Sequence, residues 1–247
     1  MRSIDLNADV GEGEDDLPLF EFVSSVSIAC GAHAGDAETM DRSIAEAARL
    51  GVAAGAHPSY PDREGYGRRR MAISDDALHA TLADQLAALA GVASRHGVRL
   101  THVKPHGALY NAAADDDALS RVIVDAIKAS DPSLGVVGLA GSALLRAAVQ
   151  SGLRAIPEGF ADRRYLADGR LAPRTTEGAI IEDPRAAADQ ASRLAAGDPI
   201  EAIDGTGLRL DVATICLHSD TSGAARIARA VRGELERRGI RIAAASG

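Results

Sequence analysis

Short apolar runs alternate with longer amphipathic stretches along the chain. The short runs are rich in Val, Ile and Ala and predict strands, because a parallel strand covered on both faces is apolar at nearly every position. The longer stretches are rich in Ala and Leu with charges at intervals, which predicts helices. The predicted strands are residues 3–10, 23–30, 51–57, 100–104, 134–139, 153–157 and 212–217, with 240–244 as a candidate eighth. The predicted helices are residues 36–50, 74–96, 115–129, 142–150, 184–196 and 222–238.

The alternation of strand and helix predicts an α/β fold with a parallel sheet and right-handed crossovers. We expect a single (β/α) barrel domain over residues 1–247, because no linker divides the chain and polar groups follow many strands. An open sheet would collect such groups at one switch point instead. Two segments break the alternation. Residues 160–179 predict a long polar loop or lid, and residues 199–209 predict a small hairpin.

Composition and charge narrow the function classes. Apolar residues make up 46% of the chain and aromatic residues only 3%, so the core must consist mainly of Ala, Val, Leu and Ile. The net charge of −8 argues against binding to nucleic acid or to an anionic membrane, since both need clustered Lys and Arg. The basic run at residues 68–70 is short and indicates an anion site or a solvated surface. The sequence predicts no signal peptide and no membrane span, and we therefore expect a cytoplasmic protein.

Polar and ionisable groups follow six of the predicted strands. They are Asn7, Asp9 and Glu12 after the first strand, His33 and Asp36 after the second, His57, Asp62 and Arg63 after the third, Lys104, His106 and Tyr110 after the fourth, Glu158, Asp162 and Arg163 after the sixth, and His218 and Asp220 after the seventh. The carboxyl ends of barrel strands form one face, and active sites lie there. Four of the seven histidines fall at this face, which predicts one site assembled from many strands.

These groups also have structural interpretations. A histidine at a strand end often satisfies a carbonyl, and Asp36 is well placed to cap the following helix. For Lys104 we favour a functional interpretation. A lysine at the end of an apolar strand is costly to desolvate unless it has a partner or a role in the site. His102 alternates with Lys104 along the same strand, and we interpret it as a core histidine that supports the site. His79 and His96 fall on predicted helices and are expected at the surface.

The chain carries no standard motif for a metal or a nucleotide. Four histidines and several aspartates could hold Zn²⁺ or a related ion, but there is no HExxH motif and no Cys cluster, so the sequence leaves a metal open. There is no P-loop and no GxGxxG after a strand. Gly141 and Ser142 lie between a strand and a helix, where they could hold a phosphate or carboxylate or form a plain turn.

Several long stretches resemble the LamB/YcsF family. They are DLNADVGEG (5–13), IACGAHAGD (28–36), GAHPSYPDREGYGRR (55–69), HVKPHGALYN (102–111), GLAGS (138–142), FADRRY (160–165), PRTTEGAII (173–181) and CLHSD (216–220). The resemblance implies the irregular seven-stranded (β/α) barrel of the glycoside hydrolase/deacetylase type. It also implies a part in ATP-dependent opening of 5-oxoproline (pyroglutamate) to L-glutamate, with ATP consumed together with Mg²⁺ and with two partner subunits, B and C.

The chain departs from the family pattern at three positions. Ser27, Ala32 and Ser219 stand where members of the family usually have Asn, Phe and Gly. Ala32 enlarges the expected pocket wall and Ser27 shortens a polar group. We expect these changes to affect specificity or rate more than the fold.

Lactam opening needs an activated electrophile, a positioned water and protonation of the leaving nitrogen. Lys104 with Arg63 or Arg163 could steady negative charge. Asp9, Glu12 or a histidine could act as base, and His106 or His57 could protonate the nitrogen. The predicted catalytic residues are Asp9, Glu12, His33, His57, Lys104 and His106, of which Asp9, His33, Lys104 and His106 are the first choice. The predicted substrate or phosphate ligands are Asn7, Arg63, Gly141, Ser142, Glu158, Asp162, Arg163, His218 and Asp220.

Two other functions remain open from the sequence. One is a stand-alone metal-dependent amidohydrolase or deacetylase that acts on a small amide or carbohydrate. The other is a non-catalytic carrier or regulatory subunit that binds a small acid. The second ranks last, because binding alone scarcely needs ionisable groups from six strands.

Overall fold

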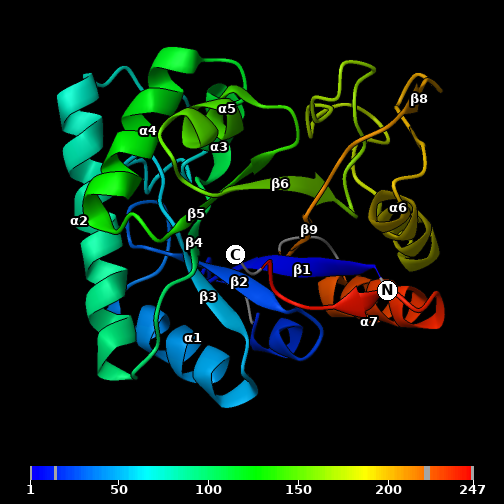
Figure 1. Ribbon diagram of the computed structural model, residues 1–247, viewed down its shortest axis with the longest axis horizontal. Coiled ribbons are helices and arrows are strands. Elements are labelled where there is room, and N and C mark those ends of the chain that lie inside the picture. The colour runs from blue at the N-terminus through cyan, green and yellow to red at the C-terminus, as the bar shows by residue number, and fades with distance from the viewer. Residues whose placement is uncertain (1, 14–15, 220–222, 246–247) are drawn as a thin grey trace.

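Seven parallel strands form the centre of the molecule and close into a barrel. The computed structural model describes residues 2–13, 16–219 and 223–245. The strands are β1 (Ser3–Val10), β2 (Ser25–Ala29), β3 (Ala53–His57), β4 (His102–Val103), β5 (Gly135–Leu139), β6 (Ala155–Phe160) and β9 (Thr214–His218), and they lie side by side in this order. β9 also pairs with β1, from Asp5↔Thr214 to Asp9↔His218, which closes the ring (Figure 1). The predicted barrel is confirmed, and β10 (Arg241–Ile242) pairs with β1 as an additional strand.

Polar side chains of β1 fill part of the barrel interior. Asp5, Asn7 and Asp9 alternate with apolar residues and are all buried. Successive side chains of a strand point to opposite faces, so these three share one face. Asn7 Nδ2 donates hydrogen bonds to Glu158 Oε1 on β6 (2.9 Å) and to Thr214 Oγ1 on β9 (2.7 Å). Asn7 thus joins three strands from inside, at the seam where the barrel closes.

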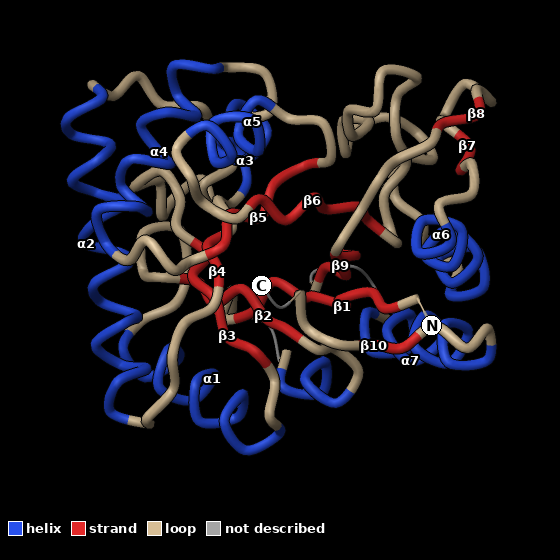
Figure 2. Tube along the Cα trace, viewed as in Figure 1, coloured by secondary structure: helices blue, strands red, loops and turns tan. Residues whose placement is uncertain are grey.

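Helices surround the barrel (Figure 2). They are α1 (Ala37–Leu50), α2 (Asp75–Arg95), α3 (Gly107–Ala113), α4 (Asp117–Ser130), α5 (Ala143–Gln150), α6 (Pro184–Ala196) and α7 (Ala224–Arg237), with a short 3₁₀ helix, η1 (Leu17–Glu21). As predicted, Asp36 caps α1 by accepting a hydrogen bond from the Thr39 amide. The helices pack Ala, Leu, Ile and Val against the strands, as the composition requires. No helix in the described part of the chain is both long and apolar enough to cross a membrane.

Besides the unpredicted η1 and shifts of one to three residues at the ends of other elements, the structure differs from the sequence-based elements around β4 and the two helices after it. The predicted strand at 100–104 is shortened to the two residues of β4, because Pro105 and the turn at Gly107 follow at once. Helix α3 was not indicated by the apolar pattern, since the segment is short and begins at a glycine. α4 begins at Asp117, two residues later than predicted, because Asp116 caps it. The hairpin is confirmed as β7 (Ile200–Glu201) with β8 (Gly207–Leu208), and residue 222, the predicted start of the last helix, lies outside the described residues.

Candidate functional site

A cavity of about 640 Å³ lies over the carboxyl ends of the strands. Residues from several strands and from the loop after β6 line it. The polar and aromatic lining residues include Asp9, Glu12, His57, Arg68, Lys104, His106, Tyr110, Asn111, Asp115, Phe160, Arg163, Arg170, Arg174 and His218. This is the face on which the sequence predicted a joint site, and the structure brings those distant segments together.

Lys104 forms the floor of the cavity. Its Nζ lies 2.9 Å from Asp9 Oδ1 and 2.8 Å from Glu158 Oε1, and its side chain is only 2% exposed. Burial alone would disfavour the ammonium, but attraction to Asp9 and Glu158 outweighs it and raises the pKa of Lys104 well above its usual value. The lysine is therefore a fixed positive charge at the end of the cavity, and the partners expected for a buried lysine are present.

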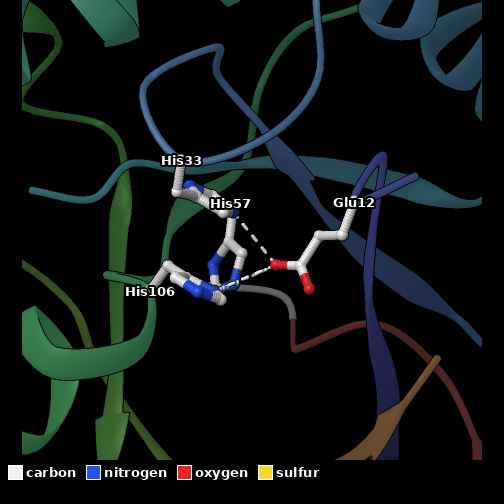
Figure 3. Close-up of side chains that lie close together, drawn as sticks. All are labelled: Glu12, His33, His57 and His106. Carbon is white, nitrogen blue, oxygen red and sulfur yellow. Dashed lines mark hydrogen bonds and ion pairs between the residues drawn. The ribbon is translucent and has the colours of Figure 1, made fainter. Parts of the chain in front are cut away.

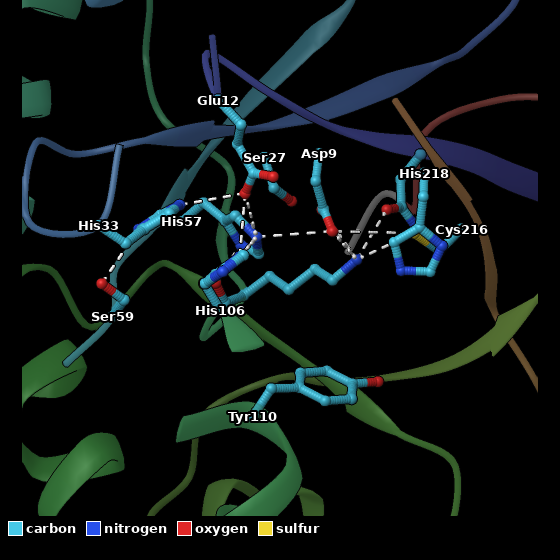
Figure 4. A network of polar contacts seen from close by, with 12 residues as sticks. Asp9, Glu12, Ser27, His33, His57, Ser59, His106, Tyr110, Cys216 and His218 are labelled. Carbon is cyan, nitrogen blue, oxygen red and sulfur yellow. Dashed lines mark hydrogen bonds and ion pairs between the residues drawn. The ribbon is translucent and has the colours of Figure 1, made fainter. Parts of the chain in front are cut away.

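The two carboxylates beside Lys104 have different environments. Burial raises the pKa of Glu158, which accepts a hydrogen bond from the Tyr110 hydroxyl (2.7 Å) in addition to those from Lys104 and Asn7. Burial also acts on Asp9, but His57 and Lys104 together lower the pKa of Asp9 to about 2. Asp9 is thus held as a carboxylate. Figure 4 shows it between the histidines on one side and His218 on the other.

Three histidines converge on Glu12 beside this floor (Figure 3). Glu12 Oε1 lies 3.0 Å from His33 Nε2, 2.9 Å from His106 Nδ1 and 3.6 Å from His57 Nε2. His106 Nδ1 lies 3.0 Å from His57 Nε2, and His57 Nε2 lies 3.5 Å from Asp9 Oδ2. The loops after β1, β2 and β4 and the last residue of β3 each contribute one side chain to this group, which we call the histidine cluster.

The outer ring nitrogens of the histidine cluster are held by the surrounding protein. His57 Nδ1 donates to the Lys104 carbonyl (2.7 Å), and His106 Nε2 donates to the Tyr66 carbonyl (2.9 Å). Burial lowers the pKa of His57 to about 3, despite the nearby Asp9, and it lowers the pKa of His33 as well. Burial also acts on the Glu12 carboxyl, but its close contacts with His106 and His33 outweigh burial and hold its pKa well below the usual value.

On the other side of Asp9, His218 forms a pair with Asp162. His218 Nδ1 lies 2.9 Å from Asp162 Oδ1, and the backbone amide of His218 donates to Oδ2 (3.2 Å). The His218 ring stacks on Phe160, with ring centroids 5.4 Å apart. A carboxylate at Nδ1 favours the tautomer with the proton on that nitrogen, so Nε2 carries the lone pair.

Other predicted site residues lie behind the cavity wall or away from it. Asn7, His33, Glu158 and Asp162 bond to lining residues rather than line the cavity themselves. The Arg63 guanidinium donates to the carbonyls of Gly31 and Gly35, both at 2.9 Å, and so ties down the loop after β2.

The predicted phosphate turn also lies outside the lining. Ser142 caps α5 by accepting from the Leu145 amide, and the Gly141 carbonyl accepts from Arg146 (3.1 Å). Ser142 thus serves as a helix cap, and phosphate or carboxylate binding by Gly141 and Ser142 stays a prediction. Asp220 lies outside the described residues.

Sequence reasoning missed most of the cationic lining. Arg68, Arg170 and Arg174 join Arg163 around the cavity. The basic run at 68–70 indicated an anion site or a solvated surface, and only one of its three arginines is at the cavity. Arg68 lines the cavity, whereas Arg69 pairs with Asp62 and Arg70 pairs with Asp116. The other two come from the polar loop after β6, whose path over the barrel no periodic pattern specifies.

Comparisons with known proteins show the family of the chain. The model of the LamB/YcsF family matches residues 4–247. A protein of Methylococcus capsulatus, named as the A subunit of 5-oxoprolinase, is 49% identical over 253 aligned residues, which cover 100% of this chain and 97% of that protein. The crystal structure of the lactam utilization protein from Thermus thermophilus superposes with a TM-score of 0.93 at 41% identity, covering 98% of this chain and 99% of that one. The chain therefore belongs to the LamB/YcsF family.

Proposed function

We propose that the chain is the A subunit of an ATP-dependent 5-oxoprolinase, which opens the lactam of 5-oxo-L-proline to L-glutamate together with subunits B and C. The names of the two similar proteins, one the A subunit of 5-oxoprolinase and the other a lactam utilization protein, support this activity. The observation that carries the proposal is the cavity floor, where buried Lys104 lies between Asp9 and Glu158 beneath an arginine-lined wall.

The chemistry of 5-oxoproline matches the lining. The molecule has one carboxylate and one ring amide, so it needs a cation for the first and polar groups for the second. Arginine forms paired hydrogen bonds with carboxylates and phosphates, and four arginines line the cavity. Small-molecule sites have volumes of about 300–1,000 Å³, and the cavity of about 640 Å³ falls within this range.

The proposed reaction has three balanced steps. The γ-phosphoryl group of ATP moves to the lactam oxygen, ADP leaves, and the ring nitrogen loses its proton. Water adds to the ring carbon, the carbon–nitrogen bond breaks, and the nitrogen takes up protons, which leaves γ-glutamyl phosphate. A second water then releases phosphate and L-glutamate.

Lys104 and His218 are the best-placed groups for these steps. Lys104 is a fixed cation that would stabilise the negative charge developing on the lactam oxygen. His218, oriented by Asp162, would take a proton from water through Nε2 and return it to the ring nitrogen. His57 and His106 fit the role of proton donor less well, because each already donates its N–H to a backbone carbonyl.

ATP with Mg²⁺ would supply the phosphoryl group, and Arg68, Arg163, Arg170 and Arg174 would contact it. The sequence has no P-loop. We therefore propose that subunits B and C supply the surface that binds the nucleotide base. The lone chain is then expected to show little activity.

Reconstitution tests the proposal. Purified chain is mixed with 5-oxoproline, with and without ATP-Mg²⁺ and with and without subunits B and C, and released glutamate and phosphate are measured. We expect glutamate only in the complete mixture, with one phosphate released for each glutamate. Glutamate release by the lone chain without ATP would overturn the proposal in favour of a stand-alone amidohydrolase. Binding of 5-oxoproline without turnover in the complete mixture would overturn it in favour of a carrier.

A further inference from the structure

The histidine cluster brings together ring nitrogens that carry lone pairs rather than hydrogens. A backbone carbonyl can only accept a hydrogen bond, so each ring nitrogen that faces one must carry the proton. His57 Nδ1 faces the Lys104 carbonyl and His106 Nε2 faces the Tyr66 carbonyl. In the neutral imidazoles, His57 Nε2 and His106 Nδ1 are therefore unprotonated.

The same reasoning applies to His33 through a hydroxyl group. Ser59 Oγ donates its hydrogen to the Tyr60 carbonyl (2.7 Å), so it can only accept from His33 Nδ1 (3.0 Å). His33 Nε2 is then the unprotonated nitrogen, and it faces Glu12 Oε1. Four electron-pair donors meet at one point: three imidazole nitrogens and one carboxylate oxygen.

Such an arrangement is repulsive unless a positive charge lies within it. When two hydrogen-bond acceptors lie about 3 Å apart, a hydrogen or a cation must lie between them. This holds for the contacts from Glu12 Oε1 to His33 and His106, and for the contact from His106 to His57. One hydrogen satisfies only one of these contacts, whereas a single divalent ion satisfies all of them.

The spacing of the four atoms also fits one ion. Zn²⁺ binds His nitrogen and carboxylate oxygen at about 2.0–2.2 Å, so ligand atoms around a tetrahedral ion are about 3.3 Å apart. The donor atoms of the cluster are 2.9–3.6 Å apart in the four contacts that join them. All four lie within 4.8 Å of one another.

We infer that Glu12, His33, His57 and His106 form a binding site for one divalent transition-metal ion of the Zn²⁺ class. Three imidazoles with one carboxylate are the ligand set that favours such ions over Mg²⁺ or Ca²⁺, which prefer oxygen. The outer hydrogen bonds of the three rings are the type of support that metal-bound histidines have. This site is separate from the Mg²⁺ that accompanies ATP, and it does not depend on the proposed function.

Binding requires a small side-chain adjustment. The rings of His33 and His106 stack nearly parallel, with centroids 3.8 Å apart, and His57 is nearly perpendicular to both. One of the parallel rings must tilt so that both lone pairs point at the ion. Glu12, His57 and His106 line the cavity, so the ion would contact an oxygen of a molecule bound there.

Direct metal binding tests the inference without any activity assay. The full chain is stripped with a chelator, dialysed, and titrated with ZnCl₂ by calorimetry. CoCl₂ is titrated in parallel, because its visible absorption reports coordination by nitrogen. We expect one Zn²⁺ for each chain, a Co²⁺ absorption band that Zn²⁺ abolishes, and a higher unfolding temperature with Zn²⁺.

Variants assign the site. His106→Gln and Glu12→Gln are expected to abolish the Co²⁺ band. Ser59→Ala removes the support of His33 and the bond to the Tyr60 carbonyl but no metal ligand, and is expected to weaken Zn²⁺ binding about 10–100-fold. His96→Gln is the matched control, because this histidine pairs with Asp41 at the surface. The unfolding temperature of each metal-free variant shows whether the fold is intact, which distinguishes loss of a metal ligand from loss of the fold. Failure of the wild-type chain to take up Zn²⁺ or Co²⁺, or equal uptake by His106→Gln, would overturn the inference.

Discussion

Asp162 contacts both the ring and the backbone of His218. Its Oδ1 lies 2.9 Å from the ring Nδ1, and its Oδ2 accepts a hydrogen bond from the His218 backbone amide. The carboxylate therefore fixes both the position and the tautomer of a histidine that lines the cavity. An amide at position 162 could keep the bond to the backbone but would favour the wrong tautomer of the ring.

We expect Asp162→Asn to lower kcat for glutamate release about 10²–10⁴-fold in the reconstituted system, since proton transfer contributes about this much. KM for 5-oxoproline should change little, because Asp162 does not line the cavity. Steady-state kinetics of the variant and of Asp198→Asn, an exposed control, provide the measurement. A rise in KM with unchanged kcat would contradict the role of Asp162 in orienting the base.

Lys104→Met should abolish glutamate release and also destabilise the fold. The substitution keeps much of the side-chain volume but leaves Asp9 and Glu158 facing each other without their shared cation. Loss of one partner of a buried pair costs about 3–5 kcal/mol. Lys128→Met is the matched control, because Lys128 is exposed near the end of α4 and its ammonium donates to the Ser151 carbonyl. Urea unfolding and the glutamate assay together check the prediction, and wild-type turnover in Lys104→Met would refute it.

His102 makes the stability depend on pH. Burial, together with repulsion from Lys104 and Arg154, lowers the pKa of His102 to about 4. In the unfolded chain the pKa is about 6.5, so between these values the unfolded state binds a proton that the native state does not. Stability from this residue is complete above pH 6.5 and is lost as the pH falls toward 4, by about 2 kcal/mol at pH 5.

The measurement compares wild type with His102→Gln by urea unfolding near pH 7.5 and pH 5, with a chelator present. The variant loses the bonds to Ser27 and Thr101 and should be less stable at pH 7.5. Its further loss on acidification should be smaller than that of wild type. His57 titrates in both proteins, so only the difference between them reports on His102. Parallel pH dependences would contradict the prediction.

Gly67→Ala should disturb the histidine cluster through the backbone. Gly67 has φ +63°, and a Cβ there would lie 2.9 Å from His106 Cδ2 and 3.0 Å from His33 Cβ. We expect a destabilisation of about 1–3 kcal/mol from strain and overpacking, together with weaker Zn²⁺ binding. Gly91→Ala is the control, because its Cβ on α2 meets no atom within 4 Å. That change should stabilise the helix by about 0.5–1 kcal/mol. Thermal unfolding and Zn²⁺ titration of both variants test the pair.

The sequence predicted the barrel well because most of the strands are apolar runs and a longer helical stretch follows most of them. The residues 3–10 even match the bounds of β1. Short elements were harder, since the seven residues of α3 carry too few turns for a helical period to show. The strand-end histidines were predicted to share a face, and they do.

Other parts of the site could not be predicted, because they depend on contacts between residues that are far apart in the sequence. Arg63 and Arg174 are both arginines in polar loops, yet one bonds loop carbonyls and the other lines the cavity. In the sequence, Gly141 and Ser142 fit a phosphate-binding turn or a plain turn equally well, and only the structure shows that Ser142 caps α5. The inward direction of each lone pair in the histidine cluster depends on carbonyls and a hydroxyl that lie far along the chain.

Asn7 joins β1 to β9 through the Thr214 hydroxyl and to β6 through Glu158, the same carboxylate that contacts Lys104. The residues that would contact the substrate are consequently bonded to the residues that close the barrel. A lineage that altered the charge of this floor to accept another substrate would loosen the ring at the same time. New specificity is therefore expected to arise first in the arginines of the loop after β6, which can change without opening the barrel.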